Sequence, residues 1–360
     1  MIDRLLRLRK YLSARKSDAF LICGEANRYY LSGFAGAGVL LVTEEKTHLV
    51  TDGRYREDAQ RAAQAGCGEI SIVCREQGED LPVTVGKLCQ ETHLKRVLAE
   101  AEHLSVAAWK KYKTALGCGR LIPSQGVIEG MRLVKSREEL AAIRRAAQIS
   151  DAAFQTVLPM FQDGVREMEI SLELERQMLL RGAAGTAFDF IVASGLRASL
   201  PHGGATTRPL AAGELVVCDF GAVWEGYHSD TTRTLVVGGK PSPRQTELFE
   251  LVRLAQESAL DVLRPGVPAE EVDAAARRVL NDAGLGDAFV HALGHGVGLE
   301  IHEEPRLRTT SRTIVEEGMV VTVEPGIYLP GWGGIRLEET VAVTAGGPDI
   351  LTKAGKFLSI

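Results

Sequence analysis

Two acidic residues, Asp219 and Asp230, stand in a segment that reads as a buried β-hairpin, where negative charge is costly. The segment LVVCDFGAVWEGYHSDTTRTLVV has two strand-like runs on either side of a turn at residues 224–226. Folding the chain about this turn brings Asp219 nearly opposite Asp230. Like charges that face each other destabilise a hairpin, and the penalty grows in a buried sheet unless a cation lies between them. The pair therefore indicates a cation site.

A second segment, GMVVTVEPGIYLPGWGGIRLEETVAV, repeats the arrangement around a turn at residues 330–334. It places Glu324 roughly opposite Glu338, whereas Glu339 should point to the other face of the strand and be exposed. One or two hard divalent cations would relieve the repulsion among all four carboxylates at once. Any single acid of the four could instead be a solvated strand end or a salt-bridge partner, and Arg233 and Arg336 are near enough in sequence for that.

The segment HALGHGVGLEIHEEPRL contains His291, His295 and His302 together with three glycines, which makes it too glycine-rich for a helix. A site of several carboxylates and one imidazole suits hard or borderline ions such as Mn²⁺, Co²⁺ or Zn²⁺. A structural zinc site would prefer cysteine and histidine ligands. His202 lies in another glycine-bounded, loop-like stretch, where a single histidine is more often structural than functional.

The elements that must position these residues begin near residue 125. Ser136 and Glu139 match a capping box, so a long helix should start there. Further helices are expected at 166–181, 243–263 and 268–283, with strand pairs at 214–220 with 227–237 and at 318–324 with 335–343. Helices and a hairpin thus occur twice in succession, which suggests two related halves around an antiparallel sheet.

The region before residue 125 alternates apolar strand-like runs with helical patterns, which favours an α/β domain. An amphipathic helix is expected at the N-terminus. Strands are expected at 19–23, 38–43, 70–73, 96–99 and 120–122, and helices near 54–65, 79–90 and 105–115. We find no phosphate-binding glycine loop or acid cluster in this part. We therefore expect a scaffold or recognition domain at 1–124 and the chemistry in a second domain at 125–360.

The composition narrows the class of protein. A chain of 360 residues is long enough for two domains, and 45% apolar with 25% charged residues is typical of a globular protein. A formal net charge of -5 gives no general attraction to nucleic acid or anionic membranes. No run approaches the roughly 18 apolar residues of a membrane span, and the N-terminus lacks the apolar core of a signal peptide. Six cysteines without a CxxC pair favour free thiols in a reducing cytoplasm.

In order and spacing, these segments resemble the metallopeptidases of the pita-bread fold, of the creatinase/prolidase type. The resemblance is carried by DFGAVWEGYHSDTTRT, GHGVGLEIHEEPRL, VEPGIY and GGIRLEE, with PHGG upstream of them. It extends to NRYYLSGFAGAGVLLVTEEKTHLVTDGRYREDA near the N-terminus, which is similar to the creatinase/prolidase N-terminal domain, and to the final LTKAGKFLSI. Within the superfamily the chain most resembles Xaa-Pro dipeptidases (prolidases) and short bacterial Xaa-Pro aminopeptidases.

The resemblance implies a site for two divalent metal ions, most often Mn²⁺, with Co²⁺ or Zn²⁺ as alternatives. Carried over position by position, Asp219 would chelate one metal and Asp230 and Glu338 would bridge both. His295 and Glu324 would complete the second metal's ligands. The activity implied is hydrolysis of the bond between a peptide's first residue and a following proline by metal-activated hydroxide.

The same resemblance implies roles around the metals. Glu324 would also handle the proton of the metal-bound water. His202 and His302 would hold the substrate and stabilise the tetrahedral intermediate, His291 would line the proline side of the pocket, and Arg306 would approach the substrate's carboxylate end. Short proline-containing peptides are then the expected partners of a cytoplasmic homodimer that binds neither nucleic acid nor membrane.

Several alternatives stay open at the level of sequence. Methionine aminopeptidase shares the implied fold but not the extra N-terminal domain or the PHG and HEEPR segments. Creatinase shares both domains, but sites of that type lack part of the ligand set found here. A non-catalytic binding module would have lost ligand residues, and this chain has lost none. The HEEPR segment slightly favours a dipeptidase over an aminopeptidase.

Overall fold

The computed structural model describes residues 2–66, 70–117 and 119–356. The chain divides into two compact units, Met1–Arg132 and Leu133–Ile360. The sequence suggested a boundary between 124 and 125, whereas helix α6 (Val127–Arg132) belongs to the first unit. Hydrogen bonds hold it there, because Tyr30 Oη donates to Met131 O at 2.9 Å and Arg132 Nη1 donates to Asn27 Oδ1 at 2.7 Å.

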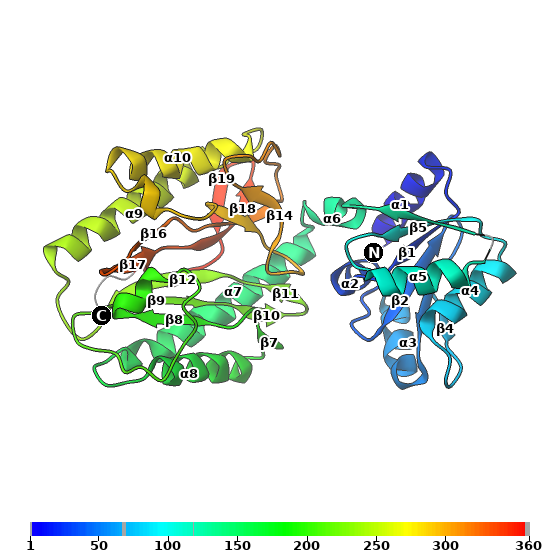
Figure 1. The fold of residues 1–360 in the computed structure, drawn as a ribbon, viewed down its shortest axis with the longest axis horizontal. Coiled ribbons are helices and arrows are strands. Elements are labelled where there is room, and N and C mark those ends of the chain that lie inside the picture. Colours follow the sequence, from blue (N-terminus) through cyan, green and yellow to red (C-terminus); the bar gives the residue numbers. More distant parts are fainter. Residues whose placement is uncertain (1, 67–69, 118, 357–360) are drawn as a thin grey trace. The chain divides into compact units, whose positions relative to one another are not determined.

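The first unit contains a six-stranded mixed sheet with the strand order β4-β3-β2-β1-β5-β6 (Figure 1). Its strands are β1 (Ala19–Ile22), β2 (Gly38–Thr43), β3 (Thr47–Thr51), β4 (Ile70–Cys74), β5 (Arg96–Glu100) and β6 (Arg120–Ser124). Its other helices are α1 (Ile2–Ala14), α2 (Glu25–Ser32), α3 (Arg56–Ala65), α4 (Leu81–Glu91) and α5 (Val106–Ala115). The expected α/β domain is confirmed, although β3 and α2 were not predicted.

Both faces of this sheet are covered by apolar packing. Leu21, Leu41 and Val50 form one cluster with Val85 and Tyr112, which come from α4 and α5. The alternate residues of these strands are also buried, as in β1, where all four residues are buried. A sheet buried on both faces reads as a continuous apolar run, which is why these strands were visible in the sequence.

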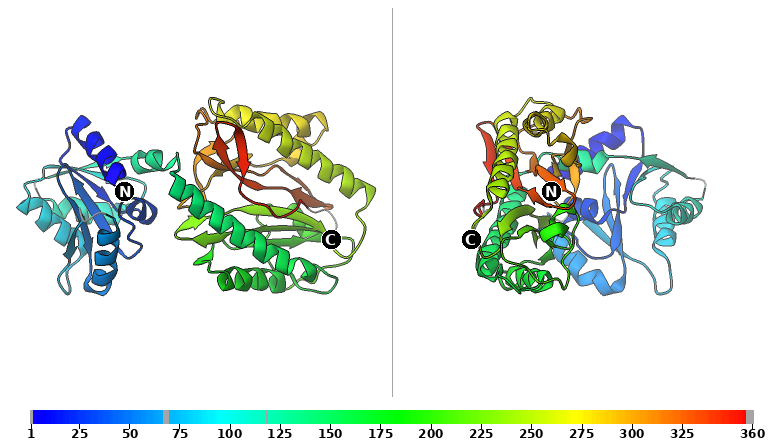
Figure 2. Two further views of the ribbon diagram at one scale, coloured as in Figure 1. Left: turned by 180° about the vertical axis from the view of Figure 1, so that it is seen from behind. Right: turned by 60° about the vertical axis from the view of Figure 1, so that its left-hand side comes forward.

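The second unit begins with α7 (Arg137–Val157), and the capping box of Ser136 and Glu139 is present at its start. It continues with α8 (Glu167–Leu180), α9 (Pro243–Val262) and α10 (Ala269–Asp282). Figure 1 shows α9 and α10 on one side of the strands of this unit and α8 on the other. In the left view of Figure 2, α7 lies across the face of the strands. The four helices expected after residue 125 are confirmed.

The strands of the second unit pair antiparallel throughout the described residues. One sheet has the order β12-β9-β8 and another the order β14-β13-β15-β18-β19, with a two-stranded β16-β17 and a small sheet β11-β10-β7. The bounds are β7 (Gly185–Thr186), β8 (Ile191–Ser194), β9 (Leu215–Phe220), β10 (Ala222–Trp224), β11 (Tyr227–His228), β12 (Thr231–Val236), β13 (Gly294–Gly296), β14 (Glu303–Leu307), β15 (Val320–Val323), β16 (Gly326–Leu329), β17 (Gly333–Arg336), β18 (Glu339–Thr344) and β19 (Gly347–Ile350). Two helices followed by a hairpin occur twice, as expected.

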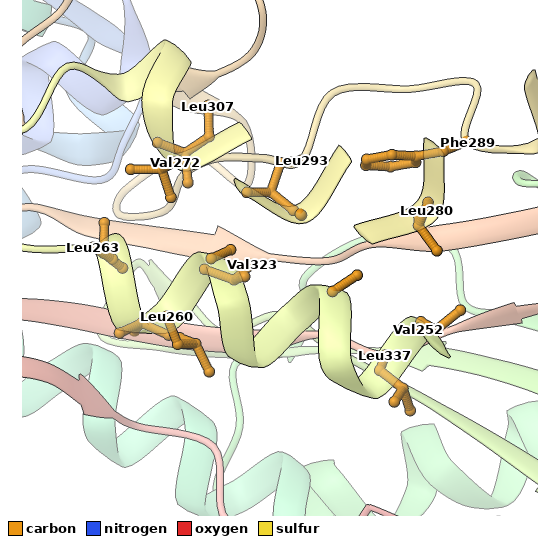
Figure 3. Packing of buried hydrophobic residues seen from close by; sticks show 14 of the residues in the cluster. Val252, Leu260, Leu263, Val272, Leu280, Phe289, Leu293, Leu307, Val323 and Leu337 are labelled. Atoms are coloured by element: carbon orange, nitrogen blue, oxygen red, sulfur yellow. The ribbon is translucent and has the colours of Figure 1, made fainter. Parts of the chain in front are cut away.

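An apolar core supports the second half of this unit (Figure 3). Val252 and Leu260 from α9 and Val272 and Leu280 from α10 pack with apolar residues of the strands. These residues are Leu307 and Val323 on strands and Leu337 between β17 and β18, and they neighbour the expected site residues Arg306, Glu324 and Glu338 in sequence. The core therefore anchors the strands directly beside the candidate site.

No helix of the described residues is long and apolar enough to span a membrane. Cys23, Cys74, Cys89 and Cys218 are free thiols, whereas Cys67 and Cys118 lie outside the described residues. Residues 357–360, the end of the LTKAGKFLSI segment, also lie outside them.

Candidate active site

The first acid pair is diagonal within its hairpin. Asp219 of β9 pairs directly with Thr232 of β12, two residues after Asp230. The turn lies at Glu225 and Gly226, which both have positive φ (49° and 79°) and are bracketed by the pair Trp224–Tyr227. Because residues two apart along a strand share a face, Asp219 and Asp230 project to the same side of the hairpin.

The second acid pair is directly opposed. Val323 pairs with Glu339, and Gly326 pairs with Arg336. The positions between these two pairs therefore set Glu324 across from Glu338, at the junction where β15–β18 passes into β16–β17. The register expected from the second turn is that of the structure.

Hydrogen bonds join the two hairpins edge to edge. The Glu338 backbone N–H donates to Thr232 O at 3.2 Å, and Thr232 Oγ1 donates to Glu338 Oε2 at 2.7 Å. Farther along, the Asp230 N–H donates to Thr340 Oγ1 at 3.3 Å, and that hydroxyl donates to Asp230 O at 2.7 Å. These contacts bring the acids of both hairpins into one buried group.

His295 on β13 completes the group. Its Nε2 lies 3.3 Å from Glu324 Oε1 and 3.5 Å from Asp230 Oδ2. Donor atoms of Asp230, His295 and Glu338 all lie within 4.8 Å of one another. The flanking glycines allow this approach, because a Cβ on Gly294 would lie 2.0 Å from Thr322 O. The glycines noted in the sequence thus serve close packing between β13 and β15.

The tautomer of His295 fits a metal ligand. Its Nδ1 lies 3.1 Å from the carbonyl oxygen of Gly296, which can only accept a hydrogen bond. A proton therefore belongs on Nδ1, which leaves Nε2, the nitrogen next to the carboxylates, as the atom that would bind a metal once it gives up its own proton. Ligating histidines are commonly oriented by such a bond on the second ring nitrogen.

Asp219 is bound on one oxygen only. Its Oδ2 accepts a hydrogen bond from Arg336 Nη2 at 2.6 Å, whereas its buried Oδ1 has no hydrogen-bond partner among the described residues. Arg336 Nη1 also donates to Tyr328 Oη at 2.7 Å. A buried carboxylate oxygen without a donor is costly, and a cation would satisfy it.

The electrostatics of the group indicate missing positive charge. Burial, with Glu338 and other carboxylates nearby, raises the pKa of Asp230 well above its usual range. Burial and the charges of Glu324 and Asp219 raise the pKa of Glu338 in the same way. For Glu324, burial acts upward but is outweighed by the hydrogen bond and charge of His295, which leaves its pKa at about 2. Four carboxylates and one imidazole fit the donor preferences of divalent ions such as Mn²⁺.

All nine residues expected at the site line one cavity of about 610 Å³. Besides the four acids, His295 and its neighbour Gly294 on β13, the wall includes His202, His291, His302 and Arg306. The rings of His295 and His302 contact each other edge to face, with centroids 4.4 Å apart. Burial, together with His295 and Arg306, lowers the pKa of His302 to about 4, so this ring is neutral at physiological pH.

The four residues around the acid–histidine group differ in whether their side chains already have hydrogen-bond or ion-pair partners. The rings of His202 and His302 make no hydrogen bond to another described residue, and the Arg306 guanidinium has no ion pair among them. His291 is engaged on both ring nitrogens, since Nδ1 lies 2.8 Å from Ala292 O and Nε2 lies 2.9 Å from Tyr328 Oη. His291 can therefore offer a substrate its ring face, whereas the other three can offer N–H donors.

Sequence reasoning missed part of the site. Arg336 was weighed as a salt-bridge partner, and it does bind Asp219, but its bond to Tyr328 was not foreseen. The cavity wall also contains Phe188, Asp189 and Ile191, which precede or begin β8. This strand is short and carries no reactive residue, so only its position just upstream of the PHGG segment pointed to it.

The expectation that Glu339 is exposed was wrong. It does point away from Glu338, but it is 3% exposed and forms an ion pair with Arg233, with Arg233 Nη2 lying 3.0 Å from Glu339 Oε2. The second face of β12 and β18 is covered by the C-terminal segment, because Arg233 Nη2 donates to Ala354 O at 2.7 Å. A polar residue on a strand was read as solvent-facing although both faces of the sheet are buried.

The first unit contains another acid–histidine group, Glu100, His103 and Glu129, whose donor atoms also lie within 4.8 Å of one another. Its oxygens already have donors. Asn27 Nδ2 donates to Glu100 Oε1 at 2.7 Å and to Glu129 Oε1 at 2.5 Å, and Glu100 Oε2 accepts the Cys23 and Gly24 N–H groups. An amide group thus lies where a cation would bind, and we assign no metal there.

Comparison with known proteins agrees with this geometry. The family model "Metallopeptidase family M24" matches residues 141–345, and "Creatinase/Prolidase N-terminal domain" matches residues 4–134. The Xaa-Pro dipeptidase of Pyrococcus furiosus is 36% identical over 99% of this chain and 100% of its own length. The solved structure of an Xaa-Pro dipeptidase from Bacillus anthracis has a TM-score of 0.95 and 38% identity, covering 100% of this chain and 99% of that one. An X-Pro aminopeptidase structure from Thermotoga maritima has a TM-score of 0.89 and 36% identity, covering 97% and 99%. The chain therefore belongs to metallopeptidase family M24, with a creatinase/prolidase N-terminal domain ahead of its peptidase domain.

Proposed function

We propose that this enzyme hydrolyses the bond between the first residue of a short peptide and a following proline, using two divalent metal ions. The observation that carries the proposal is the convergence of four carboxylates, of which all but Glu324 are buried, and the Nε2 of His295 on one cavity. The names of the relatives at 36% and 38% identity support the Xaa-Pro class of substrate.

The metal-binding residues would be Asp219, Asp230, His295, Glu324 and Glu338, with Asp230 and Glu338 shared between the ions. Asp230 and Glu338 are suited to sharing because they come from adjacent strands joined through Thr232. A pair of bound ions lowers the pKa of water towards neutrality and polarises the scissile carbonyl. Manganese is the proposed metal, since an oxygen-rich site with one imidazole suits it.

Glu324 is the proposed proton acceptor. Its Oε1 accepts a hydrogen bond from Thr322 Oγ1 at 3.0 Å and lies beside His295, so the carboxylate is held in place on the cavity wall. Although burial acts to raise its pKa, the hydrogen bond and charge of His295 lower it, so the Glu324 carboxyl is ionised at physiological pH. It can therefore take a proton from a water molecule and later pass it to the leaving nitrogen of proline.

His302 and His202 are the proposed donors to the substrate. His302 is neutral at physiological pH, so one ring nitrogen carries a proton and can donate to the oxygen of the carbonyl under attack. His202, which lies between β8 and β9 in the chain, lines the same cavity. Donors placed where negative charge develops stabilise the transition state more than the ground state.

Arg306 is the proposed partner of the substrate's terminal carboxylate. Its guanidinium lines the cavity and forms no ion pair with a described acid, which suits recognition of a planar carboxylate. For this reason we propose that dipeptides are better substrates than longer peptides. The ring face of His291 would contact the proline side. A homodimer and a cytoplasmic location remain part of the proposal on the strength of the family resemblance.

The test is to incubate metal-depleted protein, with and without Mn²⁺, with Ala-Pro, Ala-Pro-Ala, Ala-Ala and creatine. We expect Mn²⁺-dependent release of alanine from Ala-Pro, less from the tripeptide and little from Ala-Ala. Preferential cleavage of Ala-Pro-Ala would instead assign an aminopeptidase. Hydrolysis of creatine, or no hydrolysis of any substrate with metal restored, would overturn the proposal.

A further inference from the structure

Arg233 lies on the face of the sheet opposite the candidate metal site. It follows Thr232 on β12, so its side chain projects to the face of the sheet opposite Asp219 and Asp230. The side chain is 0% exposed, which is unusual for arginine and requires that every N–H find an acceptor. The contacts of this guanidinium connect the site to the C-terminal segment of the chain.

The first group of contacts reaches the site. Arg233 Nη1 donates to the backbone oxygen of Glu338 at 2.6 Å and to that of Thr232 at 2.9 Å. The same two residues are joined on the cavity face by the bond from Thr232 Oγ1 to Glu338 Oε2. Glu338 is thus fixed on both sides of the sheet, through its backbone oxygen on one face and its carboxylate on the other.

The second group of contacts reaches the C-terminal segment. Arg233 Nε donates to Gly355 O at 3.0 Å, and Nη2 donates to Ala354 O at 2.7 Å. Nη2 also binds the carboxylate of Glu339, which neighbours Glu338. The guanidinium therefore joins residues 338–339 to residues 354–355, with Nη2 contacting both.

The segment itself is anchored by other bonds. The Leu351 N–H donates to Thr340 O at 2.9 Å, and Thr352 Oγ1 donates to the Glu339 carboxylate. The N–H groups of residues 353 and 354 donate to Asp151 on α7 at 2.5 and 3.1 Å. Hydrogen bonds to Thr340, Glu339 and Asp151 thus hold a stretch that has no strand or helix structure.

We propose that residues 351–355 form a positioning element of the metal site, acting through Arg233 on the metal ligand Glu338. The inference rests on the proposed function, because it takes Glu338 as a shared ligand. A buried ion pair such as Arg233–Glu339 adds little net stability compared with apolar residues, but it defines geometry. Outer residues that orient metal ligands commonly change metal affinity by about 10–100-fold when replaced.

The experiment compares Arg233→Lys, Thr352→Val and a chain ending at Ile350 with the wild type. Mn²⁺ dissociation constants are measured by competition with a chelating dye on metal-depleted protein, and unfolding in urea is measured on the same samples. We expect Arg233→Lys and the shortened chain to bind Mn²⁺ about tenfold more weakly or worse. Excess Mn²⁺ should restore kcat for Ala-Pro without a change in KM, because the substrate contacts are untouched.

The matched control is Arg144→Ala. Arg144 Nη2 binds Asp349 Oδ2 at 2.8 Å, which ties α7 to β19 just before the segment, and both side chains are partly exposed. This bond does not touch Glu338 or Arg233, so its loss should leave Mn²⁺ affinity unchanged. If the control weakens Mn²⁺ binding as much as Arg233→Lys, the effect is general loosening and the inference is wrong.

The remaining outcomes are also decisive. Should the shortened chain fail to fold, Thr352→Val tests the inference instead. It removes the hydroxyl that donates to the Glu339 carboxylate and accepts the Thr340 N–H, and it is expected to weaken Mn²⁺ binding by less than Arg233→Lys. Folded variants with wild-type Mn²⁺ affinity would overturn the positioning role alone. A wild-type protein that binds no Mn²⁺ would overturn the proposed function instead.

Discussion

Arg336 Nη2 donates a 2.6 Å hydrogen bond to Asp219 Oδ2, and both side chains are buried. The guanidinium also donates to Pro201 O and to Tyr328 Oη, so its plane is fixed on several sides. Asp219 is therefore held in a defined orientation, and its second oxygen is buried without a hydrogen-bond partner among the described residues. The charge of Asp219 is thus compensated by the protein itself, which leaves less negative charge for a bound cation to neutralise.

Replacing Arg336 by methionine should leave Asp219 as a buried charge without its partner. We expect the metal-depleted protein to lose about 3–5 kcal/mol in its free energy of unfolding. Added Mn²⁺ should recover part of this loss, because a cation can take over the Asp219 carboxylate. Urea unfolding with and without Mn²⁺ measures both quantities. An equal loss in the two states would show that Asp219 does not meet the metal.

Substitution of a proposed metal ligand and substitution of a proposed substrate donor should affect metal content differently. Asp230→Ala removes a proposed shared ligand, so both Mn²⁺ content and Ala-Pro hydrolysis should be lost. His302→Ala should lower kcat by about 10²–10³-fold through loss of a donor to the developing oxyanion, with Mn²⁺ content intact. Metal analysis of the purified variants, alongside kinetics, checks the distinction. A fall of metal content in His302→Ala would mean that a ligand had been taken for a substrate contact.

The pH dependence of stability should differ between the metal-depleted and the Mn²⁺-loaded protein. The pKa values of Asp230 and Glu338 are raised above the ordinary 3.8 and 4.5, so the folded state keeps protons that the unfolded state has released. Stability of the metal-depleted protein should therefore fall as pH rises above the ordinary values. Glu324 has the opposite sign, and the stability it contributes is lost as pH falls towards its pKa of about 2.

Bound Mn²⁺ should remove the loss of stability at higher pH, since the ligands are then charged and paired. Mn²⁺ binding should also release protons and weaken as pH falls. Melting temperatures across pH 5 to 8, in both states, make the comparison. Parallel profiles for the two states would contradict a metal on these carboxylates.

A second buried pair supports the loop that carries His302. Lys135 Nζ lies 2.8 Å from Glu303 Oε1, and the two side chains are 1% and 7% exposed. Lys135→Met should cost about 3–5 kcal/mol because Glu303 is left buried and charged. The double variant with Glu303→Leu should regain much of that, as an apolar pair replaces an ionic one. A double-mutant cycle by urea unfolding tests this, and additive losses would show that the two residues act independently.

The elements that carry the chemistry could be predicted because their patterns are local. Alternation around the two turns gave the strands, and Glu324 does lie across from Glu338 once the pairs Val323–Glu339 and Gly326–Arg336 fix the register. The other hairpin has a two-residue offset, and the acids still share a face. The positions of all nine expected residues on one cavity follow from these registers together with the family resemblance.

What could not be predicted depends on contacts between distant segments. Glu339 reads as an exposed strand residue, and only the return of residues 351–355 to Arg233 buries it. Strand β3 was missed because THLVT is short and mixes polar with apolar residues, and its burial comes from neighbours on both sides. Nothing near Ile191 in the sequence shows that its strand pairs with Asp219.

The most direct test of the central claim is a titration of metal-depleted protein with Mn²⁺ while Ala-Pro hydrolysis is followed, with Glu338→Ala beside the wild type. The account predicts no activity without metal, a rise that saturates near two ions per chain, and no activity of Glu338→Ala at any Mn²⁺ concentration. Full activity in the metal-depleted enzyme, saturation at one ion, or substantial activity of Glu338→Ala would contradict a two-metal site built on these carboxylates.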